Sequence, residues 1–345
     1  MGGRMQGKQF EEKNARRWQE YEDTLDGVEK KRESIDVAQV PTMFREICTD
    51  LALARHRMYG MPMNEKLNSL VICGHKMINR RAGGTWEVLF RFIVVDFPVC
   101  VRKEWRLLLV ATLSFILPLV GVALAGFHWA DFSWIQAVLG PEMMGNLDQM
   151  YGNKDDQIAN LRSEHGSNFM MFCFYIWNNI GIDFRIYAGG ILACLGTLFF
   201  LIYNGVFFGA VVAYIHTACS TEAFYSFVAG HSSFELIAMV IAGMAGLRIG
   251  LGLLNPGRKT RRRSLMDSGK KSLPLIVGAA LMTFVAAAIE GFWSAQEIST
   301  TIKYSVGIAF WVFCFLYLGL SGRGMARNDE QEKGSALTEG DQSAA

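Results

Sequence analysis

The chain has 345 residues, of which 51% are hydrophobic and 19% are charged, and its apolar residues fall in long uninterrupted runs. Such runs exceed the length of core segments in small soluble proteins, so they exclude a soluble globular domain and indicate an integral membrane protein. The net charge of +2 at pH 7 is not informative by itself, because in a membrane protein the position of Lys and Arg relative to the spans decides the orientation.

Residues 1–84 are polar enough to be soluble and hold three helical patterns, RRWQEYEDTLDGVEK, FREICTDLALARHR and NEKLNSLVICGHKMI. In the first, apolar side chains recur at three and four residues and form one stripe on a charged helix: Trp18, Tyr21, Leu25 and Val28. The stripe docks on its own domain or binds a partner. We expect 1–84 to be a small helical cytosolic domain.

Residues 85–106, TWEVLFRFIVVDFPVCVRKEWR, combine a strongly apolar face with several basic side chains. This segment is too charged to span a membrane, and we expect an amphipathic helix that lies along the lipid headgroups. The run 107–129 follows without an ionised side chain. At about 1.5 Å per residue it exceeds the hydrocarbon thickness of about 30 Å, so it is the clearest predicted span.

The orientation follows from two loops of opposite charge. Residues 130–168 hold six acids against two bases, whereas 256–272 hold seven bases and one acid. Because cytosolic loops of membrane proteins are enriched in Lys and Arg, 256–272 is predicted to be cytosolic and 130–168 to be an external loop. The basic residues before 107 place the N-terminus in the cytosol as well.

The chain must then cross an even number of times between 130–168 and the next span. The uncharged run 186–215 is too long for one comfortable span and short for two. Because Asn204-Gly205 is a turn signal, we predict two short helices, 186–203 and 206–219. The preceding residues 168–184 are predicted to be an external interfacial or partly re-entrant helix, with Asn178 and Asn179 as helix caps.

Three further spans are predicted at 232–255, 273–295 and 304–320, which makes six spans with both termini in the cytosol. The tail, 321–345, is charged, rich in Gly, Ser and Ala and without periodicity, so disorder is expected there. The predicted fold class is therefore an all-α, polytopic helical membrane protein of the transmembrane domain 107–320, preceded by a helical cytosolic domain.

The predicted span 232–255 carries unusual polar groups. At about 100° per residue, His231 and Glu235 share one face with a ladder of small residues that suits close helix packing in lipid: Ala238, Ala242, Gly246 and Gly250. Arg248 points nearly the opposite way, toward the cytosolic end. A further acid, Glu290, lies near the outer end of 273–295, so His231, Glu235 and Glu290 are all expected in the outer half of the membrane.

An ionisable residue at membrane depth is costly, which makes it a functional hypothesis by default. These three side chains either form one cluster that binds a metal ion or holds a proton, or they are structural polar pairs between packed helices. Three N and O ligands suit zinc, although no HExxH-type pair is present and no metal is assigned. Arg248 either reaches the headgroups, pairs with an acid of another helix or binds an anionic lipid.

Three stretches of the chain together resemble the stage II sporulation protein M family: NNIGIDFRIYAGGILACLGTLFFLIYNGVFFGAVVAYI, GHSSFELIAMVIAGMAGLRIGLGLLNPGR and AAAIEGFW. The resemblance covers about 43–320. The residues that match the family pattern are Asn178, Asn179, Asn204, Gly205, His231, Glu235 and Glu290. One departure is Ser232, which stands where a glycine is expected.

The resemblance implies a non-enzymatic, multi-pass protein of the bacterial cytoplasmic (inner) membrane. The sporulation-related namesake works with cell-wall hydrolases during engulfment, and other members lie in gene neighbourhoods with AAA+ ATPases of the MoxR type. We expect a membrane scaffold that recruits protein partners for cell-envelope or cell-wall remodelling, without a cofactor or a nucleic-acid partner. The density of small residues suggests a homodimer, although such ladders serve packing within one chain equally well.

Two other functions stay open from the sequence. The main rival is a transporter or channel, with His231, Glu235 and Glu290 as its ion or proton site and the short helices as a broken or re-entrant element. A fainter reading is an intramembrane metal-dependent enzyme.

Overall fold

The computed structural model describes residues 2–29, 39–78, 85–128, 133–152 and 168–324, and the regular elements in these ranges are all helical. The predicted all-helical fold is confirmed. The chain divides into two compact units, Met1–Glu87 and Val88–Ala345. Parts of the predicted external loop and nearly all of the predicted disordered tail, 325–345, lie outside the described residues.

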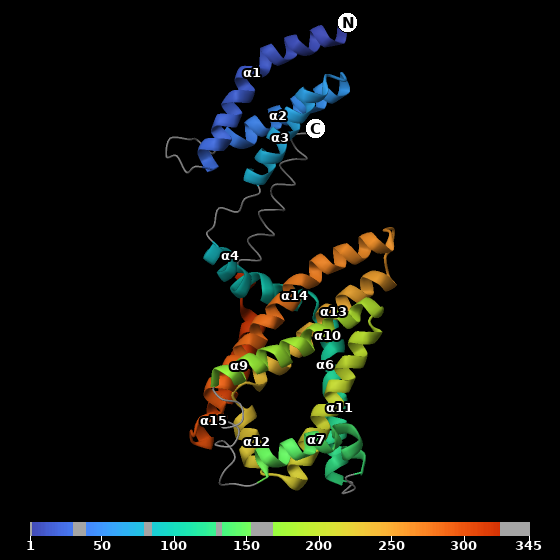
Figure 1. Cartoon of the computed structure of the whole chain (residues 1–345), viewed down its shortest axis with the longest axis vertical. Helices are drawn as coiled ribbons and strands as arrows, with labels where there is room; N and C mark the ends of the chain where they lie inside the picture. Colours follow the sequence, from blue (N-terminus) through green and yellow to red (C-terminus); the bar gives the residue numbers. More distant parts are fainter. Residues whose placement is uncertain (1, 30–38, 79–84, 129–132, 153–167, 325–345) are drawn as a thin grey trace. The chain divides into compact units, whose positions relative to one another are not determined.

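The first unit consists of three helices that pack on one another: α1 (Gly2–Glu29), α2 (Val40–His56) and α3 (Met61–Ile78) (Figure 1). Its core is built from the apolar stripe of α1 and from facing residues of the other two helices. Trp18, Tyr21, Ile47 and Leu67 are fully buried in this core. The stripe of α1 therefore docks on its own unit, which was the first of the two alternatives left open by the sequence.

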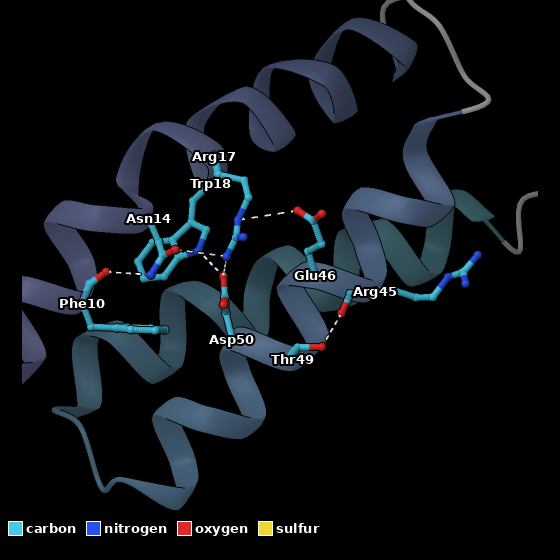
Figure 2. A network of polar contacts seen from close by, with 8 residues as sticks. All are labelled: Phe10, Asn14, Arg17, Trp18, Arg45, Glu46, Thr49 and Asp50. Atoms are coloured by element: carbon cyan, nitrogen blue, oxygen red, sulfur yellow. Dashed lines mark hydrogen bonds and ion pairs between the residues drawn. The ribbon is translucent and has the colours of Figure 1, made fainter. Parts of the chain in front are cut away.

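A buried carboxylate ties α1 to α2 inside this core. The Asp50 carboxylate accepts a hydrogen bond from Trp18 Nε1 at 2.8 Å and another from the Arg17 guanidinium (Figure 2). Glu46, one turn earlier on α2, lies 3.6 Å from Arg17 Nε. Because a buried carboxylate needs hydrogen-bond donors to offset its lost hydration, these contacts fix the register between the two helices.

The second unit begins within α4, the first of three short helical segments, and continues with long helices joined by shorter ones (Figure 1). In chain order its elements are α4 (Thr85–Arg91), η2 (Phe92–Asp96), α5 (Phe97–Lys103), α6 (Trp105–His128), α7 (Ser133–Tyr151), α9 (Asn168–Tyr175), η3 (Ile176–Ile180), α10 (Gly181–Ala188), η4 (Gly189–Leu192), α11 (Leu195–Ala218), α12 (Thr221–Val228), α13 (Ser232–Leu254), α14 (Arg261–Ile289), η5 (Glu290–Ser294) and α15 (Thr300–Leu320). The segments η2, η3 and η5 are π-helical turns, and η4 is a short 3₁₀ helix.

Five of these helices are long and apolar enough to cross a membrane: α6, α11, α13, α14 with η5, and α15. The chain is therefore a multi-pass membrane protein. The most apolar stretch of α13 is 72% buried within the chain, against 17% for α6 and for α15. Helix α13 thus forms the centre of the unit, whereas α6 and α15 present most of their apolar side chains outward, toward lipid.

The prediction of two short helices with a turn at Asn204-Gly205 is wrong. Both residues lie inside the single helix α11, where Asn204 Nδ2 donates to the Phe200 carbonyl at 2.7 Å. Gly205 faces α6, and a β carbon there would lie 2.4 Å from the Phe115 carbonyl oxygen. The pair thus permits close helix packing instead of a turn.

The chain reverses direction earlier, at Ala193 and Cys194. Both residues have positive φ angles, 51° and 71°, and they separate η4 from α11. Left-handed backbone is unusual for residues other than glycine, so sequence rules for turns do not point to this position.

The segment 168–192 packs along α14 and η5, and its assignment as an external interfacial or partly re-entrant helix stays a prediction. Its side chains contact successive levels of that helix: Asn179 contacts Glu290, Asp183 contacts Thr283, and Tyr187 contacts Ser272. The segment is broken, because the helical path through α9, η3 and α10 ends in the 3₁₀ helix η4, just before the positive φ angles of Ala193 and Cys194.

Two other boundaries differ from the predictions. Helix α14 begins at Arg261 after the N-cap Thr260, so most of the predicted basic loop 256–272 forms the first turns of a helix. The hydroxyl of Thr260 accepts a hydrogen bond from the Arg263 amide, which explains this early start. In the predicted external loop, α7 is helical and packs on α11.

Candidate polar site in the second unit

Three ionisable side chains meet where α13 begins and α14 ends. His231 is the N-cap residue of α13, Glu235 lies in its first turn, and Glu290 opens the π-turn η5. One ligand atom of each lies within 4.8 Å of the other two. His231 and Glu290 are only 3% and 8% exposed and the Glu235 side chain is 15% exposed, so the cluster is largely closed off from its surroundings. The structure thus brings together His231, Glu235 and Glu290.

The orientation of the imidazole is set by a hydroxyl. Ser294 Oγ lies 3.1 Å from His231 Nδ1, whereas His231 Nε2 lies 3.8 Å from a carboxylate oxygen of Glu235. Ser294 is itself held by the buried Lys303, whose Nζ donates to the Ser294 carbonyl at 2.8 Å. One ring nitrogen is therefore occupied by the Ser294 hydroxyl, and the other faces the Glu235 carboxylate.

Two π-helical turns supply the remaining support. Asn179, in η3, donates from Nδ2 to Glu290 Oε2 at 3.5 Å. The prediction that Asn178 and Asn179 cap helices is wrong, because both lie inside the continuous helical path of α9, η3 and α10. A π-turn widens a helix by one residue and redirects its side chains, which is how Asn179 and Glu290 come to face each other.

Aromatic residues cover the cluster. The Phe227 ring lies 5.5 Å from the His231 ring, and Tyr151 in turn packs against Phe227. Burial, followed by the charge of Glu290, raises the pKa of the Tyr151 hydroxyl above its ordinary value, so this hydroxyl stays protonated at neutral pH. Trp293 packs so closely on Gly230 that a β carbon there would lie 2.4 Å from its ring.

Arg248 belongs to a different environment. It forms an ion pair with Glu104, at the junction of α5 and α6, with 3.2 Å between Nε and the nearest carboxylate oxygen. Pairing with an acid of another helix was one of its three open alternatives. Arg248 follows Glu235 by more than three helical turns, so the two charged sites of α13 are separate.

The small-residue ladder of α13 packs within the chain. Ala238 and Ala242 are fully buried. A β carbon at Gly246 would lie 2.4 Å from Thr197 Oγ1, and one at Gly250 would lie 2.4 Å from the Cys194 amide nitrogen. Because α11 and the turn before it already occupy this face, the ladder gives no support to the expected homodimer.

Asp183 is a further buried acid that the sequence reading missed. It is 2% exposed and accepts a hydrogen bond from the Thr283 hydroxyl of α14. An acid within an apolar run indicates burial, but residues 168–184 are predicted to lie at the membrane surface, where an acid is expected. The sequence does not predict the burial of Ser294 and Lys303 either, because a serine or a lysine at a helix end is usually exposed.

Chemically, the cluster offers one imidazole nitrogen and two carboxylates in an apolar enclosure. Such a set can hold a divalent cation or take up protons. Two of the three candidate ligands belong to the start of α13 and the third belongs to η5, which are separate elements of the chain. Their meeting is thus a property of the packed bundle.

Sequence comparison places most of this unit in a known family. The family model described as Stage II sporulation protein M matches residues 108–295. The chain belongs to the stage II sporulation protein M family. The stage II sporulation protein M region includes the whole cluster, together with Asn179 and Ser294, whereas Lys303 and Glu104 lie outside it.

A second model, a domain of unknown function (DUF8413), matches residues 8–80 and thus covers most of the first unit. No curated protein and no solved structure matches the chain. The family match therefore identifies the kind of membrane protein without assigning an activity, a substrate or a partner.

Proposed function

We propose that this protein is a non-enzymatic membrane scaffold that recruits protein partners at a bacterial cytoplasmic (inner) membrane. The observation that carries the proposal is the division of the chain into two compact helical units, of which, among the described residues, only the second holds candidate membrane spans. A scaffold needs a stable membrane body and a separate surface for partners. The second unit supplies the body, and the first unit supplies the separate surface.

The packing of the membrane body supports this role. Helix α13 is surrounded by α6, α10, α11, α14 and α15. The charged groups Arg248 and Asp183 each have a partner on another segment of the bundle. Interior polar groups that are paired in this way stabilise one arrangement of helices, which suits a body that holds partners in place.

The first unit offers an apolar tip for a partner. Met58 and Met61, where α2 meets α3, are 90% and 76% exposed. Flexible methionine side chains adapt to different partner surfaces at low cost. By the family resemblance, the classes of partner are cell-wall hydrolase complexes and MoxR-type ATPase systems. A cytosolic first unit, as the basic residues before α6 predict, favours the ATPase class.

The test is quantitative capture of partners from native membranes. The full chain is compared with a variant carrying Met58→Glu and Met61→Glu, and with a control carrying Lys66→Glu on the same unit. We expect the methionine variant to lose most of its specifically captured proteins, while the control keeps them. A captured set that is identical for all three chains would contradict a partner surface at this tip.

A second candidate function is transport of an ion or proton, which the meeting of His231, Glu235 and Glu290 favours. It predicts flux across liposomes containing the purified chain. Flux that is lost in Glu235→Gln and Glu290→Gln, while both variants remain folded, would overturn the scaffold as the sole function. Equal ion permeability of liposomes with and without the chain would leave the scaffold as the better account.

A further inference from the structure

We infer that His231, Glu235 and Glu290 form a resident site for one divalent transition-metal ion, with Zn²⁺ as the best-suited ion. The inference does not depend on the scaffold function, because it concerns what occupies the interior of the bundle. Three observations carry it: the spacing of the ligand atoms, the orientation of the imidazole and the charge of the enclosure.

The spacing is close to that of a metal site before the ion draws its ligands in. With metal–ligand bonds of about 2.1 Å, two ligand atoms of a tetrahedral site lie about 3.4 Å apart. The candidate atoms of His231, Glu235 and Glu290 lie within 4.8 Å of one another, and the imidazole–Glu235 pair is at 3.8 Å. Small side-chain rotations would bring all three atoms onto one ion.

The support around the imidazole is of the kind that metal sites use. A ligating histidine gives its second ring N–H to a neighbouring acceptor, which fixes the tautomer and leaves the other nitrogen free to bind the ion. Ser294 Oγ lies 3.1 Å from Nδ1 and is placed to accept this hydrogen bond. Asn179 donates a hydrogen bond to the Glu290 carboxylate and so helps to orient it. Nε2 is thereby left facing the Glu235 carboxylate, 3.8 Å away.

The charge of the enclosure requires a positive partner or protons. Within the ranges that the structure describes, no Lys or Arg forms an ion pair with Glu235 or Glu290; the buried Lys303 donates to a carbonyl instead. Two adjacent buried carboxylates repel each other and have lost their hydration. One divalent cation would neutralise both and would also use the free imidazole nitrogen, which protonation of the acids leaves without a role.

The ligand set selects the class of ion. An imidazole nitrogen combined with two carboxylate oxygens suits Zn²⁺ and neighbouring transition metals, whereas Mg²⁺ and Ca²⁺ prefer sites made only of oxygen. Three protein ligands leave a fourth position for water or another donor. The location, between the start of α13 and the end of α14, makes the ion a clamp between the two helices with the most extensive mutual packing.

The experiment measures metal content and stability of the full chain, purified without a histidine tag. The protein is stripped with a chelator, incubated with Zn²⁺, freed of unbound ion and analysed for zinc per chain by mass spectrometry. We expect about one zinc per chain and a higher unfolding temperature than in the stripped protein. His231→Ala and Glu290→Gln should lower the zinc content to background.

Asp183→Asn is the matched control, because it alters a buried carboxylate of the same bundle outside the cluster, and it should retain one zinc. A second measurement requires no variant: Zn²⁺ should raise the unfolding temperature of the stripped wild type, whereas Mg²⁺ should not. Wild-type protein without bound zinc or zinc-dependent stabilisation would overturn the site. So would one zinc per chain in folded His231→Ala.

Discussion

At the scale of single residues, the most unusual buried polar group of the first unit is Tyr21. Its side chain is fully buried, and its hydroxyl has no hydrogen-bond partner among the described residues. Gly74 makes room for it, because a β carbon there would lie 1.8 Å from the hydroxyl oxygen. Burial, with smaller contributions from two nearby cysteines, raises the pKa of Tyr21 to about 12.

Tyr21→Phe is therefore expected to be neutral or to stabilise the first unit by up to about 1 kcal/mol, because it removes a buried hydroxyl that gains nothing from folding. The stability advantage of Tyr21→Phe over the wild type should grow at alkaline pH. The raised pKa means that Tyr21 contributes full stability below its ordinary pKa of 10 and loses it as the pH rises toward about 12.

The measurement is thermal unfolding of the wild type and Tyr21→Phe from neutral pH to above pH 10. The variant should lose less stability than the wild type in that alkaline range. A Tyr21→Phe variant that is several degrees less stable at neutral pH would show that the hydroxyl has a partner after all.

At the scale of elements, glycines determine how closely the broken segment approaches α13. A β carbon at Gly190, in η4, would lie 2.0 Å from the Gly246 carbonyl oxygen, and Gly189 faces Gly196 of α11 in the same way. These contacts are between backbones, which cannot move aside as the end of a flexible side chain can. In lipid, where burial from water does not drive helix association, such close contact supplies much of the attraction.

Gly246→Ala should thus lower the unfolding temperature of the membrane unit, at a cost of about 1–3 kcal/mol for overpacking. Its β carbon would lie 2.4 Å from Thr197 Oγ1 and 2.9 Å from the Ile186 carbonyl oxygen. Gly319→Ala on α15 is the matched control, because nothing lies within 4 Å of its added β carbon. Thermal unfolding in detergent compares the two, and equal stability would contradict the close packing at Gly246.

At the scale of the whole molecule, the broken segment 168–192 decides the topology. If it crosses with the five long apolar helices, the chain has six crossings and its two ends lie on the same side. By the positive-inside rule we predict that both ends are then cytosolic and that α7 lies outside. If the basic residues before α6 and those after α13 are both cytosolic, then without that crossing α6 and α11 would both have to leave the cytosol, which is impossible for consecutive spans.

Cysteine labelling on intact cells tests this topology. The background replaces the exposed Cys73 and Cys173 with serine. Glu142→Cys, on α7, should react with a membrane-impermeant maleimide before lysis. Arg258→Cys, between α13 and α14, should react only after lysis. The opposite pattern would reverse the orientation, and labelling of both in intact cells would contradict an odd number of crossings between them.

Much of this fold is predictable because the bilayer imposes simple rules. Length and hydropathy predict α13 and the other long apolar helices, and the apolar stripe that includes Trp18 predicts the core of the first unit. The predictions that are wrong concern the positions where one helix ends and the next begins. Asn204-Gly205 has the composition of a turn but lies inside α11, while the actual reversal at Ala193 and Cys194 carries no turn residue. Local propensity was overruled there by contacts between helices.

For the candidate site, the sequence by itself determined which groups are costly. Helical periodicity placed His231 and Glu235 on one face, and the cost of an acid in an apolar run singled out Glu290. Only the tertiary structure decided what surrounds them, because Asn179 and Ser294 come from π-turns that redirect side chains away from regular helical angles. Periodicity follows from one helix, whereas the convergence of ligands depends on how several helices pack.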